Sequence, residues 1–296
     1  MCYVSRVNGK WIFAALVAGC GAFVLAVLRR AAKRRVGEGW PTNFAHRGAS
    51  LIAPENTLEA FRLAAQSGAG GLELDVHMTS DGRIVVIHDD SVDRTTEGTG
   101  LVRGMTLHEI QSLDAGFRFV PDGGTAYPYR GRGVRVPELG EVLREFPGHK
   151  VNIDIKEEQT GVEVALLETI KGADAGERTL VVSEMPAVVE RVRELSGNSI
   201  STGASRQEIR DFYRLSRLRL ELLVRPPYDA LQVPVEYGGR EVVTPRFVNA
   251  AHDRGVRVDV WTIDDLGEMR RLLDLGVDVI MTNRPEVLDG VLGERR

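Results

Sequence analysis

Ionisable side chains of the kinds used in catalysis stand in four short apolar segments of this chain. They are His46, Arg47, Glu73, Asp75, His88, Asp154 and Lys156. Residues two apart on a β-strand point to the same side, so Glu73 and Asp75 share a face, as do Asp154 and Lys156. Charges on the inner face of a sheet are costly to desolvate unless they are paired or bind a cation.

Two arrangements would satisfy these charges. Three convergent carboxylates, Glu73, Asp75 and Asp154, favour a hard divalent cation such as Mg²⁺ or Ca²⁺, which prefers oxygen ligands. In the alternative, Glu73 and Asp75 form interior ion pairs with Arg47 or Lys156. The sequence favours the metal site and leaves the ion pairs as the competing interpretation.

The charged segments belong to an alternation of strand-like and helix-like patterns that runs from residue 43 to the C-terminus. Short stretches rich in Val, Ile and Leu predict buried strands at residues 43–46, 71–77, 84–88, 151–156, 179–183, 199–202, 220–224, 257–262 and 278–282. Patterns between them predict helices at residues 57–66, 162–171, 187–195, 206–217, 245–254 and 266–275. About eight repeats of strand and helix predict an α/β fold of the TIM (β/α)₈ barrel type over residues 43–292.

A doubly wound open sheet is the competing fold. The stretch after the first predicted strand, His46-Arg47-Gly48-Ala49-Ser50, lacks the spacing of the Gly-rich dinucleotide-binding fingerprint, so the barrel is favoured. In such a barrel the active site lies at the C-terminal ends of the strands, and that is where the ionisable residues stand.

The composition argues against two other classes of protein. The 296 residues carry 38 Lys and Arg against 42 Asp and Glu, a formal net charge of -4, which provides no basic surface for nucleic acid. Cys2 and Cys20 are the only cysteines and precede the predicted barrel, so neither a disulfide framework nor a thiolate metal cluster can hold it together. No feature of the sequence implies an obligate protein partner.

The first 42 residues differ from the rest of the chain. Residues 11–28 form an uncharged apolar run that is just long enough to cross a bilayer as a helix. A cleaved signal peptide would carry its main positive charge before this run, so we predict an uncleaved transmembrane anchor, with residues 1–10 as a tail and 29–42 as a basic juxtamembrane linker. The positive-inside rule then places the barrel on the cytoplasmic side. The cations of the linker are Arg29, Arg30, Lys33, Arg34 and Arg35.

Lipidation is an alternative for this segment. Val17-Ala18-Gly19-Cys20 resembles the bacterial lipoprotein processing motif, which would leave Cys20 lipidated and the barrel outside the cell. The apolar residues that continue after Cys20 argue against it. Both alternatives keep the barrel at a membrane.

Several short motifs resemble those of the glycerophosphodiester phosphodiesterase family, in the same order. They are Ala45-His46-Arg47-Gly48, Ala53-Pro54-Glu55-Asn56-Thr57, Glu73-Leu74-Asp75-Val76, Val86-Ile87-His88-Asp89, Asp93-Arg94-Thr95-Thr96, Val136-Pro137-Glu138-Leu139, Asn152-Ile153-Asp154-Ile155-Lys156, Trp261-Thr262 and residues 278–285. Each motif alone is a weak signal, but together they cover nearly all of the chain from residue 43 onward. The resemblance implies a barrel enzyme that uses two histidines and one divalent metal to release glycerol 3-phosphate and an alcohol.

Carried onto this sequence, the resemblance implies that His46 and His88 are the general acid and base. Histidine suits both roles because its ordinary pKa lies near working pH. The metal would be held by Glu73, Asp75 and Asp154 and would act as a Lewis acid on a phosphoryl oxygen. The remaining implied roles are phosphate binding by Arg47 and Lys156, metal bridging or orientation by Glu55, and glycerol packing by Trp261.

The chain departs from the family pattern at two positions. Asp154 stands where Glu is usual, which shortens the third predicted metal ligand by one methylene. Asn283 stands where Asp is common, and we expect this change to concern structure more than chemistry. The family also has an insertion that corresponds to residues 90–137. Its aromatic and arginine side chains either cover the site and contact the substrate's alcohol group or belong to an ordinary surface loop. The remaining histidines, His77, His108, His149 and His252, are predicted to be structural or solvated.

The leading functional prediction is therefore metal-dependent hydrolysis of glycerophosphodiesters. The membrane segment raises an alternative, a lysophospholipase D that acts on membrane lysophospholipids. A catalytically inactive, membrane-tethered binding module is disfavoured, because binding alone would not require acid and base groups around a metal.

Overall fold

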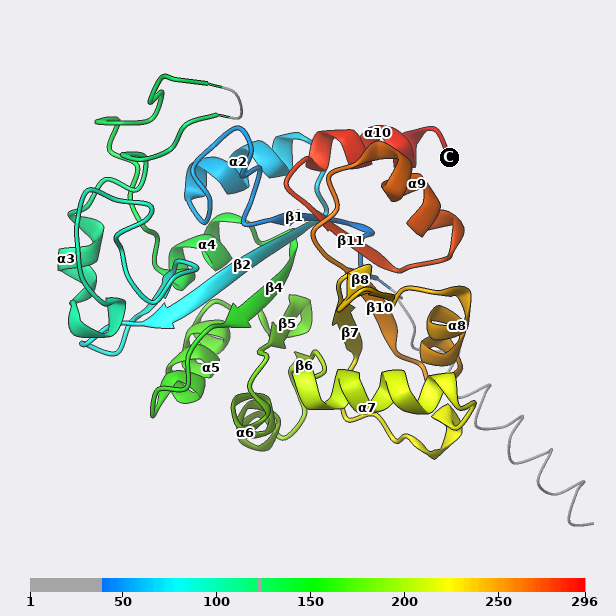
Figure 1. The fold of residues 1–296 in the computed structure, drawn as a ribbon. Coiled ribbons are helices and arrows are strands. Elements are labelled where there is room, and N and C mark those ends of the chain that lie inside the picture. Colours follow the sequence, from blue (N-terminus) through cyan, green and yellow to red (C-terminus); the bar gives the residue numbers. More distant parts are fainter. Residues whose placement is uncertain (1–38, 122–123, 296) are drawn as a thin grey trace, which may run out of the picture.

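Parallel strands form a ring at the centre of the computed structural model, which describes residues 39–121 and 124–295 (Figure 1). The strand order is β6-β5-β4-β2-β1-β11-β10-β7, and a parallel bridge between Gly203 and Ala230 closes the ring between β6 and β7. The predicted barrel is therefore confirmed. Its strands are β1 (Asn43–His46), β2 (Gly71–Met78), β4 (Lys150–Ile155), β5 (Thr179–Val182), β6 (Ser201–Thr202), β7 (Ala230–Val233), β10 (Arg257–Val260) and β11 (Val279–Thr282).

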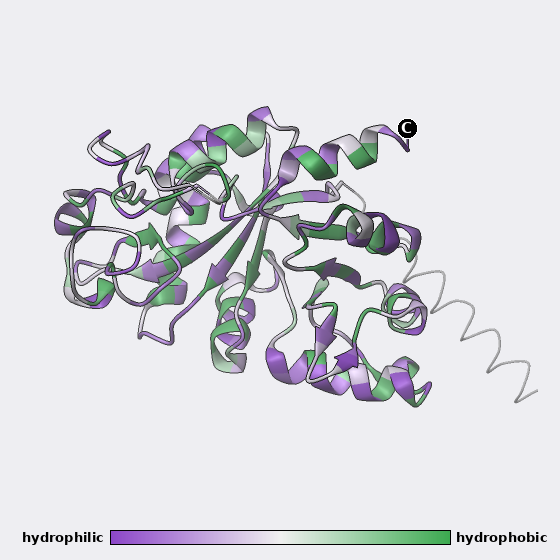
Figure 2. Cartoon of the chain, turned by 45° about the horizontal axis from the view of Figure 1, so that its top comes forward, coloured by the Kyte–Doolittle hydropathy of each residue, from purple (hydrophilic) through white to green (hydrophobic). Residues whose placement is uncertain are grey.

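Helices connect these strands and cover the outside of the ring (Figure 1). They are α2 (Leu58–Gln66), α4 (Leu139–Glu145), α5 (Val162–Gly172), α6 (Pro186–Ser196), α7 (Arg206–Arg217), α8 (Pro245–Asp253), α9 (Leu266–Asp274) and α10 (Pro285–Gly293). The helices carry both hydrophobic and hydrophilic residues, as expected when one face of a helix is buried against a sheet (Figure 2). The sequence prediction missed α4 and α10, which have seven and nine residues.

Smaller elements decorate the connections of the barrel. Strand β3 (Ile84–Val86) pairs antiparallel with β2 and begins the long β2–α4 connection, and a two-stranded hairpin follows β7. The other small elements are η1 (Val102–Gly104), α3 (Leu107–Gln111), η2 (Gly176–Arg178), η3 (Glu221–Leu223), β8 (Glu236–Tyr237) and β9 (Arg240–Glu241).

The predicted strand at residues 220–224 is wrong. This segment forms the 3-10 turn η3, and the strand at this place in the ring is β7, at Ala230–Val233. Arg219 adopts a left-handed conformation with φ 62° and ends the preceding helix α7. Leu223 is 73% exposed, so the leucines of this run do not all face the core. The apolar residues of this segment therefore led to a wrong prediction of a buried strand.

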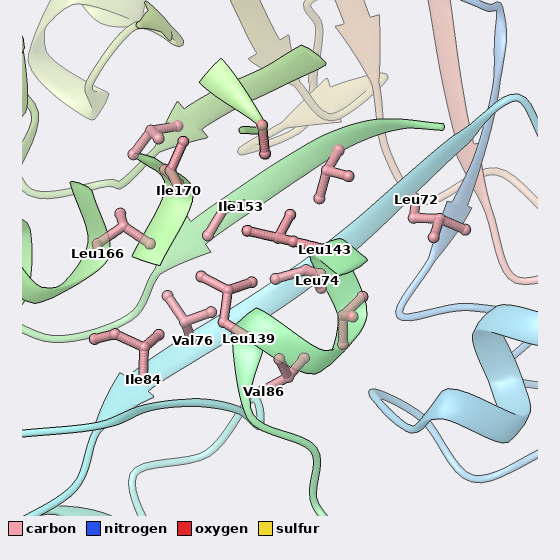
Figure 3. Close-up of a cluster of buried hydrophobic side chains, with 14 of the residues drawn as sticks. Leu72, Leu74, Val76, Ile84, Val86, Leu139, Leu143, Ile153, Leu166 and Ile170 are labelled. Carbon is pink, nitrogen blue, oxygen red and sulfur yellow. The ribbon is translucent and has the colours of Figure 1, made fainter. Parts of the chain in front are cut away.

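Strand β2 shows how the sequence separates the outside of the barrel from its interior. Leu72, Leu74 and Val76 belong to a buried cluster that joins β2 and β4 to helices α4 and α5, and Figure 3 shows Leu139 and Leu166 of these helices on the same side. The alternate positions of β2 therefore point into the barrel, because successive side chains of a strand face opposite sides. These positions are Glu73, Asp75 and His77.

Aromatic and charged residues fill the base of the barrel, where the described chain begins. The ring of Trp40 stacks on Phe44 with 6.0 Å between the ring centroids, and the guanidinium carbon of Arg257 lies 4.1 Å from the centre of the Trp40 ring. Arg257 Nη2 lies 3.2 Å from Asp259 Oδ2, and both side chains are almost fully buried. The base is thus closed by packing and by an internal ion pair.

The membrane segment predicted from the sequence cannot be located in the structure. The tail at 1–10, the apolar run at 11–28 and the linker up to residue 38 lie outside the described residues, as do Cys2 and Cys20. Among the helices of residues 39–121 and 124–295, none combines the length and the apolar composition that crossing a bilayer requires.

Candidate active site

The first strand ends in a tight turn that places several site residues. Arg47 and Gly48 both have positive φ angles, 56° and 83°. A Cβ atom on Gly48 would lie 2.7 Å from the carbonyl carbon of Ala60, so only glycine fits there. The turn directs the backbone N–H of Arg47 toward Glu73, whose Oε2 accepts it at 3.0 Å. A non-glycine residue in this conformation is strained, which is common at functional sites.

His46, the last residue of β1, is held between two polar side chains. Its Nδ1 lies 2.8 Å from Asn283 Oδ1, and its Nε2 lies 4.0 Å from Glu73 Oε2. Burial lowers the pKa of His46, and the nearby positive charge of Arg47 lowers it further. The ring is therefore neutral at neutral pH. The expectation that Asn283 concerns structure more than chemistry needs correction, since this side chain contacts the predicted catalytic histidine directly.

Two of the predicted metal ligands face each other across neighbouring strands. Asp75 of β2 and Asp154 of β4 are paired in the sheet register. Lys156 Nζ lies 3.0 Å from Asp75 Oδ1 and 2.6 Å from Asp154 Oδ2. On the other side of Asp75, Oδ2 accepts a hydrogen bond from Asn56 Nδ2 at 2.9 Å and lies 3.1 Å from Arg47 Nε. For Asp75 the structure thus shows the ion-pair arrangement that the sequence left as the competing interpretation.

Carboxylates outnumber cations in this part of the site. Burial raises the pKa of Glu73 well above its ordinary range, and the charge of Asp75 raises it further. Burial also raises the pKa of Asp154 to about 6. The pKa of Asp75 is lowered, because the charges of Lys156 and Arg47 outweigh the opposing effect of its burial. Lys156 and Arg47 therefore favour the ionised form of Asp75. The carboxyl groups of Glu73 and Asp154 remain costly to ionise.

A line of alternating charges continues from Arg47 across the mouth of the barrel. Arg47 Nη1 lies 3.0 Å from Glu55 Oε1, and Arg94 Nη2 lies 2.7 Å from the same oxygen. Arg94 Nε lies 2.6 Å from Asp89 Oδ2, and this hydrogen bond lowers the pKa of Asp89 to about 2. We call the line the charge chain; in order its members are Asp89, Arg94, Glu55, Arg47, Asp75, Lys156 and Asp154.

His88 stands at the end of the charge chain. Its Nδ1 lies 2.7 Å from Asp89 Oδ1, and the ring of His77 bonds to the backbone carbonyl of His88 through Nε2 at 3.1 Å. The charges of His88 and Asp75 influence each other, as do those of His46 and Asp75. Asp75 is therefore within electrostatic reach of both predicted catalytic histidines. His77 supports the backbone, as its predicted structural role implies.

The predicted metal ligands fit a divalent cation by type but are not gathered into a cage. Within residues 39–121 and 124–295, no three His, Cys, Asp or Glu side chains converge closely enough to hold a metal ion. The ammonium group of Lys156 instead lies against both Asp75 and Asp154. The carboxylate groups nevertheless outnumber the neighbouring cations. Carboxylate oxygens are the ligands that Mg²⁺ and Ca²⁺ prefer.

Two predicted elements of the site lie toward solvent. Trp261 directly follows β10 and is 39% exposed, so its indole is free to meet a ligand at the mouth of the barrel. In the insertion, the guanidinium carbon of Arg130 lies 4.1 Å from the ring centre of Phe117 and 3.6 Å from that of Tyr127. The aromatic and arginine residues of the insertion thus pack on one another.

Comparison with known proteins identifies the family. The model of the "Glycerophosphoryl diester phosphodiesterase family" matches residues 46–287. The chain belongs to this family. It is 37% identical over 256 residues to a glycerophosphodiester phosphodiesterase of Caldanaerobacter subterraneus, an alignment that covers 82% of this chain and 94% of that protein. It is also 30% identical over 273 residues to a glycerophosphodiester phosphodiesterase of Bacillus subtilis, covering 83% of this chain and 85% of that protein.

Solved structures agree with this assignment. A phosphodiesterase of Oleispira antarctica in complex with the product sn-glycerol-3-phosphate is 26% identical, with a TM-score of 0.68, and covers 86% of this chain and 97% of that one. A glycerophosphoryl diester phosphodiesterase domain from Mycobacterium tuberculosis shares the fold with a TM-score of 0.75 at 21% identity, covering 87% of this chain and 100% of that one.

Sequence reasoning missed Asp264 and named Asn283 only as a departure that concerns structure more than chemistry. Asn283 follows β11 and contacts His46, and Asp264 accepts a hydrogen bond from Asn283 Nδ2 at 2.7 Å. The position of Asn283 directly after a strand was the available signal, because polar residues there point into the mouth of the barrel. Asp264 lies in a loop and gave no comparable signal.

Proposed function

We propose that this chain hydrolyses glycerophosphodiesters to glycerol 3-phosphate and an alcohol, with His46 and His88 as the acid–base pair. Membership of the family makes it a phosphoric diester hydrolase, and the product bound to the Oleispira antarctica relative supports the substrate class. The observation that carries the proposal is the matched arrangement of the two rings. In each, Nδ1 meets an oxygen acceptor, Asn283 for His46 and Asp89 for His88, which leaves Nε2 for proton transfer.

The proposed chemistry divides among the residues at the barrel mouth. One histidine removes the proton of the attacking hydroxyl, and the other donates a proton to the oxygen of the departing alcohol. The attacking group is either water or a neighbouring hydroxyl of the substrate, in which case a cyclic phosphate forms first. Arg47 and Lys156 bind the phosphate oxygens and offset the charge that builds on them. The exposed ring of Trp261 packs against the glycerol.

We further propose that one divalent cation, Mg²⁺ or Ca²⁺, binds at Glu73, Asp75 and Asp154. The excess of carboxylates over cations supports it, since Arg47 and Lys156 face three carboxylates and burial raises the pKa of both Glu73 and Asp154. Lys156 must give up its contact with at least one carboxylate when the cation enters. A bound cation would polarise a phosphoryl oxygen, and the contacts from Glu55 through Arg47 to Asp75 hold the Asp75 carboxylate in place.

The proposal is tested by one assay with the full-length chain in detergent. Glycerophosphocholine is the substrate, and glycerol 3-phosphate is followed by ³¹P NMR, with and without a chelator. We expect product from the wild type, a strong loss on chelation, and a loss with His46→Ala but not with the exposed control His108→Ala. Equal product in every sample, or none in any, would refute the proposal. A transient cyclic phosphate signal distinguishes attack by the substrate's own hydroxyl from attack by water.

The apolar run at residues 11–28 favours a second substrate class and a location. We propose that this run anchors the chain in a membrane with the barrel on the cytoplasmic side, and that lysophospholipids are alternative substrates. Lysophosphatidylcholine in the same assay tests the substrate, since release of lysophosphatidic acid is required of a lysophospholipase D. Protease protection of membrane vesicles tests the side, because a cytoplasmic barrel is cleaved only after the cytoplasmic face is exposed.

A further inference from the structure

The last strand of the barrel brings a polar relay against His46. Strands β1 and β11 lie side by side (Figure 1), with Ala45 paired to Thr282. The next residues along these strands, His46 and Asn283, therefore emerge together at the mouth. Asp264, in the loop between β10 and α9, lies behind Asn283. The relay thus consists of Asp264, Asn283 and His46, and Asp264 is its outermost member.

The hydrogen bonds of Asp264 fix which way the amide of Asn283 points. Asp264 Oδ1 accepts the backbone N–H of Asn283 at 2.8 Å and the hydroxyl of Thr282 at 3.0 Å. Asp264 Oδ2 lies 2.7 Å from the side-chain nitrogen of Asn283. A carboxylate only accepts hydrogen bonds, so it is the NH₂ group of Asn283 that faces Asp264. The amide oxygen must then face the imidazole of His46.

The orientation of the amide in turn fixes the tautomer of His46. Asn283 Oδ1 lies 2.8 Å from His46 Nδ1 and cannot donate a hydrogen bond. A hydrogen bond between them therefore requires the hydrogen on Nδ1, which leaves the lone pair of the neutral ring on Nε2. That nitrogen lies 4.0 Å from Glu73 Oε2, on the side of the carboxylates and the charge chain.

We propose that Asp264 and Asn283 are positioning residues that hold His46 in the Nδ1–H tautomer, and that the neutral His46 ring is the one whose Nε2 accepts the proton of the attacking hydroxyl. This inference rests on the proposed function. The hydrogen-bond partner of the His46 ring is the neutral amide of Asn283, which does not attract a proton to the resting ring. The partner of His88 is instead the carboxylate of Asp89.

The proton transfers balance in this assignment. The O–H bond of the attacking hydroxyl breaks as an N–H bond forms at His46 Nε2, and the oxygen's electron pair forms the new bond to phosphorus. The bond from phosphorus to the departing oxygen breaks, and that oxygen takes the proton of His88 to leave as the alcohol. After this step His46 carries the proton of the attacking hydroxyl and is cationic, and His88 has given its proton to the alcohol. The charge on His46 is delocalised onto the Nδ1–H that points at Asn283.

The substitution Asp264→Asn tests the relay without touching substrate. An amide at position 264 keeps an oxygen for the backbone N–H of Asn283 but presents NH₂ where Oδ2 stood. Two NH₂ groups then oppose each other, so the amide of Asn283 turns over and presents NH₂ to His46 Nδ1. The ring must accept there, and its hydrogen moves to Nε2. We expect kcat to fall by about 10²-fold or more with KM within about twofold.

A double variant restores the polarity of the relay. In Asn283→Asp/Asp264→Asn the NH₂ group at position 264 donates to a carboxylate at 283, whose other oxygen again accepts from His46 Nδ1. We expect this variant to recover at least about tenfold in kcat over Asp264→Asn. The matched control is Asp265→Asn, the neighbouring residue, which caps α9 through a hydrogen bond from Glu268 N at 2.8 Å; asparagine caps equally well, so kcat is unchanged.

A spectroscopic readout makes the inference independent of activity. In full-length protein carrying ¹⁵N-histidine, the side-chain nitrogen shifts distinguish the two tautomers, and His46→Gln assigns the signal. We expect Nδ1–H in the wild type, Nε2–H in Asp264→Asn, and Nδ1–H again in the double variant. Nε2–H in the wild type, or full kcat in Asp264→Asn, overturns the inference. A wild type that shows Nδ1–H but hydrolyses no glycerophosphodiester would instead refute the proposed function.

Discussion

The interior of the barrel holds two polar layers that differ in charge balance. The lower layer, near the base, consists of Asn152, Gln232, Arg257 and Asp259, and the upper layer, at the mouth, consists of Arg47, Glu73, Asp75, Asp154 and Lys156. In the lower layer one cation meets one carboxylate, and Gln232 Nε2 donates to Asn152 Oδ1 at 2.9 Å. In the upper layer two cations meet three carboxylates, and the pKa values of two of these carboxylates are raised by burial.

This difference in charge balance suggests that the lower layer stabilises the fold and that the upper layer binds ligands. The lower layer needs no ligand, because Arg257 neutralises Asp259 and Trp40 covers the pair from below. The upper layer has one carboxylate more than it has cations, as expected of a layer that takes up a further cation. We therefore expect substitutions in the lower layer to change the free energy of unfolding, and substitutions at the mouth to change the rate of hydrolysis or the affinity for ligands.

The largest expected effect is on the rate, at the two histidines. His46→Ala and His88→Ala each remove one proton-transfer group, so kcat for glycerophosphocholine should fall by about 10²- to 10⁴-fold. The melting temperature should change less with His88→Ala than with His46→Ala, since the His88 side chain is 32% exposed and that of His46 only 19%. Steady-state kinetics and thermal unfolding measure the two quantities. The control is His108→Ala, an exposed position in helix α3 of the insertion. An equal loss of kcat in this control would show that the effect is not specific to the residues at the mouth.

The second expectation concerns stability at the lower layer. Arg257→Met leaves Asp259 buried without its partner, which should cost about 3–5 kcal/mol of unfolding free energy. The kcat of the folded enzyme should stay within about twofold of the wild type. Urea unfolding and active-site-normalised kinetics give both values. The double variant Arg257→Met/Asp259→Leu should recover part of the stability, and a lower layer that tolerates Arg257→Met without cost would contradict its structural role.

The third expectation is a pH-dependent affinity for Mg²⁺ or Ca²⁺ at the upper layer. Burial raises the pKa of Asp154 from its ordinary 3.8 to about 6, so in the cation-free protein its contribution to stability is fully present below 3.8 and is lost as pH rises through 6. Cation binding needs the ionised form. Affinity should therefore rise as the pH is raised through 6, by up to about tenfold per pH unit for the proton of Asp154 and further where Glu73 must also lose its proton.

This affinity is measured by calorimetric titration of Mg²⁺ or Ca²⁺ into chelator-treated protein, repeated at pH values from about 5 to about 8 in steps of about half a unit. Asp154→Asn should weaken binding and flatten the pH profile. Asp278→Asn, which alters a carboxylate bonded to His252 on the outside of the barrel, is the control. The absence of binding heat for both cations at the highest pH would show that Lys156 satisfies the upper layer by itself.

The smallest expected effect is at the rim. Trp261→Ala removes an exposed indole that packs on the glycerol, so KM should rise about fivefold, equivalent to about 1 kcal/mol, with kcat nearly unchanged. Tyr237→Ala, which truncates a 75% exposed aromatic residue of the β8–β9 hairpin, is the control and should leave KM as it is. If kcat falls instead of KM rising, Trp261 belongs with the chemistry and not with binding.

Spacing along the sequence predicted the barrel and the shared inner face of its charged residues, whereas their roles followed from the family resemblance and stay predictions. Alternation in β2 put Glu73 and Asp75 on the inner face, and the parallel strands brought Asp154 beside Asp75. The spacing alone could not decide whether a bound cation or the ammonium group of Lys156 balances the charge of these carboxylates, because Lys156 lies on the same face as Asp154. The segment 220–224 misled for a related reason, since hydropathy alone does not reveal that Leu223 faces solvent.

The relay behind His46 lay beyond sequence reasoning for a different reason. The contact between His46 and Asn283 joins residues 237 positions apart, and it exists only because β11 returns beside β1. The direction of the Asn283 amide depends further on Asp264, which lies in a loop without a periodic pattern. Strand-end placement can suggest that a residue faces the site, but it does not reveal which atom it presents.

The closure of the ring has a consequence for how the barrel opens under thermal motion. Strand β6 has two residues, and the single bridge from Gly203 to Ala230 joins it to β7. In the circular strand order this weak seam lies diametrically opposite the junction of β1 and β2, where His46 is in register with Glu73. Backbone amides at the seam should therefore exchange with deuterium first and those at the β1–β2 junction among the last. We therefore expect the barrel to open first at the wall opposite His46, so that thermal motion disturbs the proposed acid–base group least.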